Sequence, residues 1–279
     1  MQLHSIDTGF FKLDGGAMFG VVPKVLWSRW SEPDAKNLCT WAMRCLLIEE
    51  GDRLILVDCG IGNKQSEKFF KYFEPHGEDD LVNSLKMKGF HPDDVTDVLL
   101  THLHFDHCGG AVYRDSDGVS RSQFKNAKYW SHEEHWNNAM EPNPREKASF
   151  LKENFLPIKE NGQLNFLNNG QDLIPGVSVQ TVSGHTECMM LPHIQYKGKT
   201  LVYMADLLPS AAHIPLPYVM AYDVQPLETM KEKQHFLELA EKENHVLFFE
   251  HDKEIECCTT KKTEKGIRLD QTFPLLELS

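Results

Sequence analysis

An α/β fold with a β-sheet in each half of the chain is the architecture that this sequence predicts. Apolar or alternating runs predict strands in the first half near Gln2–Ile6, Met18–Val22, Trp41–Glu49 and Leu54–Asp58. An amphipathic helix is expected around Asp79–Lys88. Because the same pattern of strands recurs after Val177, we expect two similar halves that pack together.

The densest group of candidate metal ligands follows a predicted buried strand, Val95–Leu100. His102, His104, Asp106 and His107 fall within six residues. In an extended strand, residues two apart share a face, so His102 and His104 can converge on one ion. Asp106 and His107 lie past the strand and can turn toward a second ion. Imidazole nitrogen and carboxylate oxygen suit zinc, so the segment predicts a metal site.

Three later strands also end at potential ligands. The alternating run Val177–Val182 leads to His185, the run Lys199–Ala205 leads to Asp206, and the run ending at Glu250 leads to His251. A single polar residue at a strand end is more often a satisfied local group. Four such elements in one chain favour a metal centre instead.

These motifs, taken in order, carry a family resemblance. His-x-His-x-Asp-His, then Gly184-His185-Thr186, then an apolar strand into Asp206 and a late His251 resemble the metallo-β-lactamase superfamily over nearly the whole chain. The resemblance implies an αβ/βα sandwich of four layers, in which two mixed β-sheets are flanked by helices in a single domain, residues 1–279. The stretch Leu13–Gly20 is similar to the branch that contains N-acyl homoserine lactonases and methyl parathion hydrolase.

The resemblance also implies a dinuclear ligand set. It assigns one metal to His102, His104 and His185, and the other to Asp106, His107 and His251, with Asp206 bridging the two. The implied cofactor is two zinc ions, with manganese, iron or cobalt as alternatives. Asp106 and Asp206 are the candidate catalytic residues. Their main expected role is to bind metal, and a second role is to carry a proton during product release.

A helical insertion is expected at about residues 131–156. Ser131-x-x-Glu134 is a capping-box pattern, so a helix is expected to begin there. His132 and His135 lack the four-residue spacing of a metalloprotease motif, and we expect both on the helix surface.

Several further residues have two interpretations each. Asp58 is expected to orient a metal-bound histidine, the alternative being a turn carboxylate bonded to local backbone. His213, Tyr218 and Tyr222 are candidates for a hydrogen bond to substrate, and each is otherwise structural. The segment Trp27–Trp30 is expected to be a partly exposed aromatic patch that lines a pocket or packs on a second subunit, so a homodimer is left open.

Composition limits the partners. The 279-residue chain has a net charge of −12, which argues against nucleic acid and anionic membranes. The start has no signal-peptide pattern, no run reaches membrane-span length, and seven cysteines without disulfide-like spacing favour a reducing compartment. We therefore expect a cytoplasmic protein with a small-molecule substrate.

The predicted function is a dinuclear, zinc-dependent hydrolase of a small ester, lactone or related acyl compound. A water shared by two metals is acidic enough to supply hydroxide near neutral pH. The alternatives are a phosphotriester or phosphodiester hydrolase and, with less support, an iron oxidoreductase or persulfide dioxygenase of the same fold. Lactonases of the resembling branch usually place a tyrosine three residues after the bridging aspartate, whereas this chain has Pro209.

Overall fold

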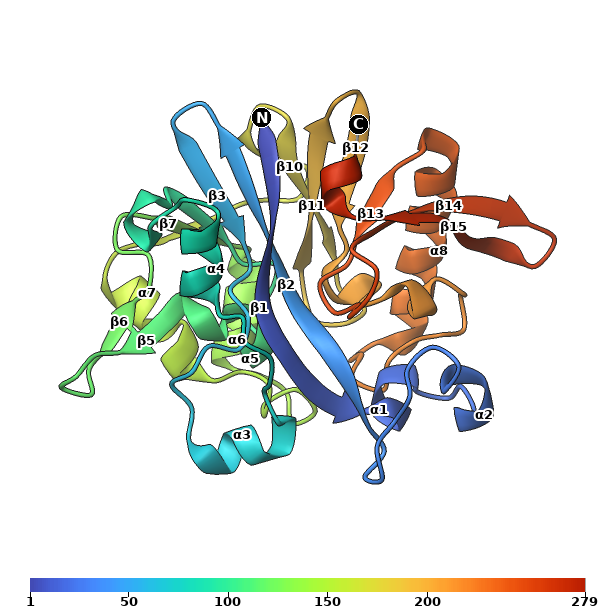
Figure 1. Ribbon diagram of the computed structural model, residues 1–279, viewed down its shortest axis with the longest axis horizontal. Helices are drawn as coiled ribbons and strands as arrows, with labels where there is room; N and C mark the ends of the chain where they lie inside the picture. The colour runs from blue at the N-terminus through green and yellow to red at the C-terminus, as the bar shows by residue number, and fades with distance from the viewer. Residues whose placement is uncertain (279) are drawn as a thin grey trace. The chain divides into compact units, whose positions relative to one another are not determined.

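The computed structural model describes residues 1–278, and the chain divides into two compact units. Unit 1 comprises Met1–Gly9 and Met43–Asn169, and unit 2 comprises Phe10–Ala42 and the chain from Gly170 onward. Figure 1 shows the order of helices and strands along the chain. No helix among the described residues combines the length and the apolar character that crossing a membrane requires.

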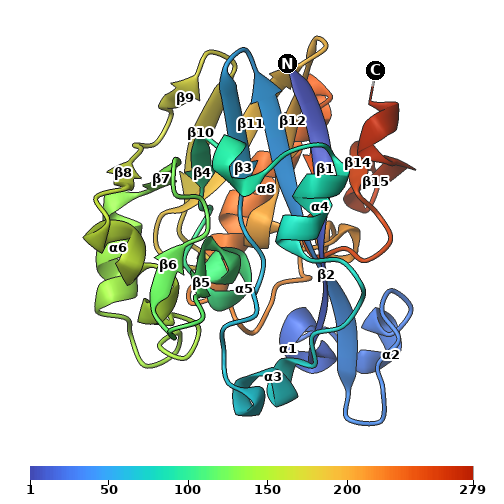
Figure 2. The same ribbon diagram turned by 60° about the vertical axis from the view of Figure 1, so that its left-hand side comes forward.

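The first sheet has six strands in the order β1-β2-β3-β4-β7-β8. Their bounds are β1 Gln2–Asp14, β2 Leu38–Glu50, β3 Arg53–Val57, β4 Asp97–Leu99, β7 Lys128–Ser131 and β8 Leu164–Phe166. The β2–β3 pair is antiparallel, and β3, β4, β7 and β8 run parallel, so the sheet is mixed. In Figure 2, β1 and β2 lie side by side in the blue part of the chain, and β3 follows β2 in the strand order. The strands expected near Trp41–Glu49 and Leu54–Asp58 are confirmed as β2 and β3.

Short helices and one hairpin complete unit 1. Their bounds are α3 Glu67–Phe73, α4 Leu81–Met87, α5 Phe105–Cys108, α6 Glu133–Met140, α7 Leu156–Glu160, β5 Val112–Arg114 and β6 Ser120–Ser122, with 3-10 turns η1 Pro92–Asp94, η2 Gly109–Ala111 and η3 Lys152–Asn154. The amphipathic helix expected around Asp79–Lys88 is α4. The Asp80 side chain caps it by accepting from the Asn83 amide at 2.9 Å, and Leu81 and Leu85 are buried.

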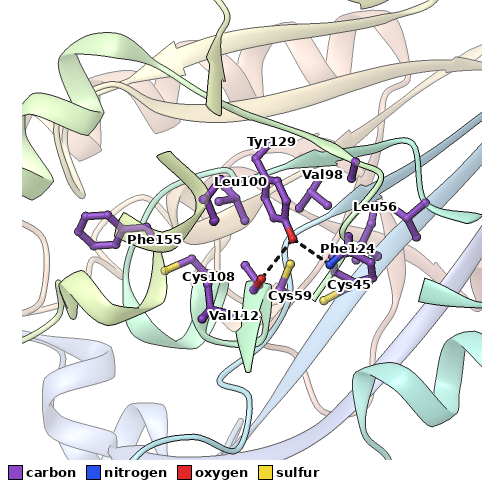
Figure 3. Close-up of a cluster of buried hydrophobic side chains, with 14 of the residues drawn as sticks. Cys45, Leu56, Cys59, Val98, Leu100, Cys108, Val112, Phe124, Tyr129 and Phe155 are labelled. Carbon is purple, nitrogen blue, oxygen red and sulfur yellow. Dashed lines mark hydrogen bonds between the residues drawn. The ribbon is translucent and has the colours of Figure 1, made fainter. Parts of the chain in front are cut away.

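The core of unit 1 surrounds the buried Tyr129 side chain (Figure 3). Its hydroxyl donates to the Ala111 carbonyl and accepts from the Phe124 amide, each at 3.1 Å. Because both hydrogen bonds are made, the phenol can lie in an apolar core without an unsatisfied polar atom. Burial raises the pKa of Tyr129 well above its usual value.

A buried ion pair joins β3 to β4. Asp97, 1% exposed, accepts from Arg53 Nε at 2.7 Å and lies 2.6 Å from Arg53 Nη2. It also accepts from the Thr96 hydroxyl and the Trp130 indole at 2.6 and 2.8 Å. Burial disfavours the carboxylate, but these donors outweigh it and lower the pKa of Asp97.

Replacing Asp97 with alanine should destabilise the protein by about 1–3 kcal/mol, because the Trp130 indole loses its buried acceptor and the half-buried Arg53 loses its ion-pair partner. The pKa of Asp97 is lower in the folded protein than in the unfolded chain. The stability that Asp97 contributes is therefore fully present above its unfolded pKa and is lost as the pH falls through its folded pKa. Urea unfolding at pH 7 and below pH 4 tests both statements. The exposed Asp52→Ala is the control, and equal stability of the two variants at pH 7 would contradict the account.

Unit 2 is built on a seven-stranded sheet in the order β15-β14-β13-β12-β11-β10-β9. Their bounds are β9 Asp172–Ile174, β10 Val177–Val182, β11 Met189–Tyr196, β12 Lys199–Tyr203, β13 Val246–Phe248, β14 Cys257–Thr263 and β15 Gly266–Phe273. Only the β12–β13 pair is parallel among the paired strands of this sheet in the described chain. The strands expected from Val177 and Lys199 are thus confirmed as β10 and β12.

The helix α8 (Pro226–Glu243) packs against β14 and β15 and buries Phe236, Leu237 and Ala240. Shorter elements of unit 2 are α1 Gly15–Phe19, α2 Lys24–Trp27, η4 Ala205–Leu207, η5 Ala211–His213 and η6 Leu275–Glu277.

Two predictions in the N-terminal region were wrong. The strand expected at Met18–Val22 overlaps the helix α1, which begins because the Asp14 side chain accepts from the Ala17 amide at 2.8 Å. Trp27 belongs to the core: it is 2% exposed and its ring stacks on Phe19 with centroids 5.2 Å apart. Trp30, by contrast, is 46% exposed, as expected for the whole patch.

The segment 131–156 holds α6 and η3, and the single domain with an insertion here stays a prediction. The cap of α6 is His132, whose ring accepts from the Glu134 amide at 3.2 Å, whereas Ser131 is the last residue of β7. The expectation that His135 lies on the helix surface was wrong, because its side chain is fully buried.

Candidate metal centre

Unit 1 contributes four buried ligand candidates, which we call the unit 1 ligand group: His102, His104, Asp106 and His107. His102 and His104 lie in the loop between β4 and α5, and the other two lie in the first turn and body of α5. His102 Nε2 is 3.1 Å from His104 Nδ1, and the rings of His102 and His107 have centroids 3.9 Å apart. As the spacing in the sequence predicted, the imidazoles of His102 and His104 converge.

Asp58 anchors this loop from the end of β3. One carboxylate oxygen accepts from the Thr101 amide at 2.7 Å, and the other accepts from the Thr101 hydroxyl at 2.6 Å. The second oxygen is also 3.1 Å from His107 Nδ1. An occupied Nδ1 leaves Nε2 of His107 as the ligand atom, so the geometry favours the orienting role of Asp58 over that of a local turn carboxylate.

Two side chains that the sequence analysis did not assign to the site support the same loop. His135 Nε2 accepts from the Leu103 amide at 2.8 Å, between the two histidines of the motif. Glu146, 4% exposed, has one oxygen 3.8 Å from His104 Nε2, while the other accepts from the side-chain amides of Asn138 and Asn143 at 2.9 and 2.7 Å. The segment around α6 therefore contributes an oriented carboxylate next to a candidate ligand.

Unit 2 contributes three buried candidates, the unit 2 ligand group: His185, Asp206 and His251. The two oxygens of Asp206 point to different rings. One is 3.0 Å from His185 Nε2 and the other is 3.2 Å from His251 Nε2. Ala205, just before Asp206, has a φ of +40°, a strained value for a residue with a Cβ. The backbone thus holds Asp206 between two histidines at a conformational cost.

The far side of each unit 2 histidine is also bonded. His185 Nδ1 is 2.8 Å from a carboxylate oxygen of Asp223, and His251 Nδ1 donates to the Ala42 carbonyl at 2.8 Å. Both contacts direct Nε2 toward Asp206. Burial disfavours the charged ring of His185, but Asp206 and Asp223 on either side raise its pKa to about 10.

The loop that carries Asp223 is tied to α8 by a buried lysine. Lys233 Nζ donates to the carbonyls of Pro215, Leu216 and Tyr218 at 2.9, 3.3 and 2.7 Å. Burial lowers the pKa of Lys233 to about 7. This contact could not be predicted from the sequence, because lysine in a helix is usually solvent-exposed.

The three candidates for substrate contact lie in different surroundings. His213 is 1% exposed, and its ring nitrogens are 2.8 Å from the Ser210 hydroxyl and 2.9 Å from the Met18 carbonyl. With both nitrogens occupied it is a core residue, and we do not propose that it contacts substrate. Tyr218 is half-buried, with its ring edge on Phe19, and Tyr222 is 39% exposed.

The donor chemistry of each ligand group fits zinc. Donors about 2.1 Å from one tetrahedral ion lie about 3.4 Å from each other. The ring nitrogens of His102 and His104 are 3.1 Å apart, and the Asp206 oxygens are 3.0 and 3.2 Å from their histidine nitrogens. Buried imidazole and carboxylate donors at such distances, with their outer atoms already bonded, are typical of prepared zinc ligands.

Comparison with known proteins identifies the family. Residues 44–251 match the sequence profile described as the Metallo-beta-lactamase superfamily. The chain belongs to this superfamily. Its α/β class with mixed sheets, and the resemblance inferred from the motifs, are thereby confirmed.

Individual superfamily members are similar over most of their length. An N-acyl homoserine lactonase of Bacillus thuringiensis is 26% identical over 237 residues, which cover 79% of this chain and 84% of that protein. A probable metal-dependent hydrolase from Staphylococcus aureus, whose crystal structure is known, is 29% identical in sequence to this chain. The two structures superpose with a TM-score of 0.88 over 100% of this chain and 98% of the other. AidC, a dizinc quorum-quenching lactonase solved with the product N-hexanoyl-L-homoserine, is 21% identical, with a TM-score of 0.77 over 98% and 95% of the two chains.

Proposed function

We propose that this protein hydrolyses lactones and esters that carry an apolar acyl group. It is a metal-dependent hydrolase of ester-type bonds, and its cofactor is two zinc ions. The similarity to an N-acyl homoserine lactonase over 79% of the chain supports a lactone or ester substrate over the phosphoester and iron-dependent alternatives.

The proposed ligands are those that the motif order implied. His102, His104 and His185 would hold one zinc ion, Asp106, His107 and His251 would hold the other, and Asp206 would be shared. Two features support the assignment: each ligand group fits zinc by itself, and Asp206 presents its two oxygens in two directions.

Bound zinc supplies a hydroxide nucleophile near neutral pH and polarises the scissile carbonyl. The protein's own residues prepare the site for this chemistry. Asp58 and Asp223 fix the rings of His107 and His185 by their Nδ1 atoms, so the Nε2 atoms need no reorientation during turnover. We propose that Asp106 or Asp206, besides binding metal, would hold a proton when the ester bond breaks.

A phenylalanine cluster, Phe69, Phe73 and Phe105, is the observation that carries the substrate class. Phe105 directly precedes Asp106 and contacts Phe69 and Phe73 of α3 with ring centroids 5.1 and 4.5 Å apart. Phe69 and Phe73 are half-buried, whereas Phe105 is buried beneath them, so the two α3 rings form a partly exposed apolar surface beside a ligand. Such a surface suits a hydrophobic substrate group next to the reacting bond.

The position three residues after Asp206 is Pro209, which has no hydroxyl to offer a lactone. Tyr218 and Tyr222 remain proposed sources of a substrate hydrogen bond. Tyr222→Phe should then lower kcat without loss of zinc.

We also propose that the protein is cytoplasmic and forms a homodimer. All seven cysteines are free and buried, which supports a reducing compartment. Val21, Val25 and Trp30 are 91%, 72% and 46% exposed, and an apolar surface of this kind supports a subunit contact. Light scattering on the purified protein tests the dimer.

The double substitution Phe69→Ala/Phe73→Ala should lower kcat/KM for a decanoyl ester about tenfold or more, because each ring buries acyl methylenes. Hydrolysis of the acetyl ester should change by less than about threefold, since a methyl group does not reach the cluster. Initial rates on esters of two to twelve carbons measure both effects. Tyr72→Ala, 66% exposed on the same helix, is the matched control. An equal loss on short and long esters would rule out the cluster as an acyl site.

A further inference from the structure

A cavity separate from the candidate metal centre lies within unit 2, and none of the ligand candidates lines it. Its volume is about 710 Å³, within the range of small-molecule sites. It lies among α8, the tip of the β14–β15 hairpin and the loop 214–217; Figure 1 shows this hairpin in red beside the orange α8. The α8 residues lining it are spaced as one helix face: Gln234, Leu237, Glu238, Glu241 and Lys242. We call this cavity the α8 groove.

The inner part of the α8 groove is apolar. Ile214 and Leu237 are 1% and 3% exposed, and Leu216, Pro217 and Ile267 complete the apolar lining. The hairpin contributes Ile267 from β15, the edge strand of the sheet. A ligand that fills this part must therefore carry an apolar segment.

The rim of the groove is basic in a chain of net charge −12. Four cations line it against two carboxylates, Glu238 and Glu241, so the local balance is +2: Lys242, Lys262, Lys265 and Arg268. Glu238 already accepts from Gln234 at 3.0 Å. Within residues 1–278 none of the four cations forms an ion pair with a protein carboxylate. The adjacent Lys261, which does not line the groove, is paired with Asp270 at 2.9 Å.

We propose that the α8 groove is a binding site for a free, single-chain amphipathic carboxylate, such as a medium-chain fatty acid anion. The alkyl chain lies on Ile214, Leu237 and Ile267, and the carboxylate meets the hairpin cations Lys262, Lys265 and Arg268. Charge complementarity selects the anion, and the limited volume of the groove selects one chain rather than a lipid bilayer. This site is independent of the proposed hydrolysis.

Titration of the zinc-loaded protein with sodium decanoate by calorimetry tests the proposal. Decanoate is also the acid that a decanoyl ester would release at the zinc ions, so we expect a saturable site in the α8 groove in addition to product binding there. The affinity of the groove should rise about fourfold per methylene from hexanoate to decanoate, as burial of alkyl groups predicts. The double charge reversal Lys262→Glu/Lys265→Glu should weaken decanoate about tenfold or more, because two attractive charges become repulsive. Lys199→Glu, an exposed lysine of the same unit that does not line the groove, is the control and should leave the affinity within about twofold.

A second variant, Leu237→Gln, leaves the hairpin unchanged. It should weaken the binding of decanoate more than the binding of hexanoate. Decanol should bind more weakly than decanoate, and anionic phosphatidylglycerol vesicles should not retain the protein. Decanoate affinity that is unchanged by the double charge reversal would place the ligand elsewhere, at the zinc ions for example, and would overturn the proposal. Tight retention on the vesicles would overturn it in favour of a membrane surface.

Discussion

Replacing Asp206 with alanine is expected to lower kcat/KM for ester hydrolysis by about a thousandfold or more, the largest effect of any single change. The reason lies in the two directions of its carboxylate, whose oxygens are 3.0 Å from His185 Nε2 and 3.2 Å from His251 Nε2. On the proposed assignment, its removal would delete a ligand that both ions share and a charge that offsets their mutual repulsion. Elemental analysis of the purified variant should accordingly give fewer than two zinc ions per chain.

Asp172→Ala is the control for this change, because Asp172 is an exposed strand carboxylate of the same unit. It should retain full zinc content and rate. If Asp206→Ala keeps both zinc ions together with wild-type turnover, Asp206 does not bridge the metals.

Replacing Asp223 with alanine is expected to have the next largest effect, a loss of about 10- to 100-fold in zinc affinity and a similar loss in kcat/KM. Asp223 touches no proposed zinc ion. It lies 2.8 Å from His185 Nδ1, is 1% exposed, and fixes the direction of Nε2. Competition with a fluorescent zinc chelator measures the affinity, and initial rates measure the activity.

Asp223→Asn separates orientation from charge, since the amide oxygen can still accept from the ring. We expect it to recover part of the zinc affinity that alanine loses. A wild-type zinc affinity in Asp223→Ala would show that the backbone alone orients His185, and the positioning role would be abandoned.

The convergence of His102 with His104 could be predicted because it depends on local geometry. They are two residues apart in a loop that follows a short strand, so backbone direction decides where the side chains lie. His185, Asp206 and His251 were identified by a related argument, because each follows a strand of one sheet.

The residues behind the ligands could not be predicted, because tertiary contacts place them. Asp223 is 38 residues from His185, and His135 is 32 residues from Leu103. Nothing near them in the sequence marks an Asx turn or a metal motif. His135 illustrates the difficulty: because it lacks the spacing of a metalloprotease motif, we expected it on the helix surface, but packing buries it against the ligand loop.

The wrong strand at Met18–Val22 has a comparable origin. Its apolar residues fit a buried strand or a short buried helix equally well, and the Asp14 cap decided for the helix. Gly15 then allows close packing, since a Cβ there would lie 2.4 Å from the Trp27 ring. This contact helps to explain why Trp27 is in the core and only Trp30 is exposed.

Zinc titration of the metal-free protein, followed by its rate of N-decanoyl homoserine lactone hydrolysis, tests the central claim most directly. If the protein is a dinuclear hydrolase of apolar acyl lactones, it should have little activity without zinc. Its rate should reach a plateau only when the second equivalent of zinc is added. A plateau at one equivalent, or a zinc-loaded protein that leaves the lactone intact while cleaving a phosphodiester or a glutathione thioester, would contradict it.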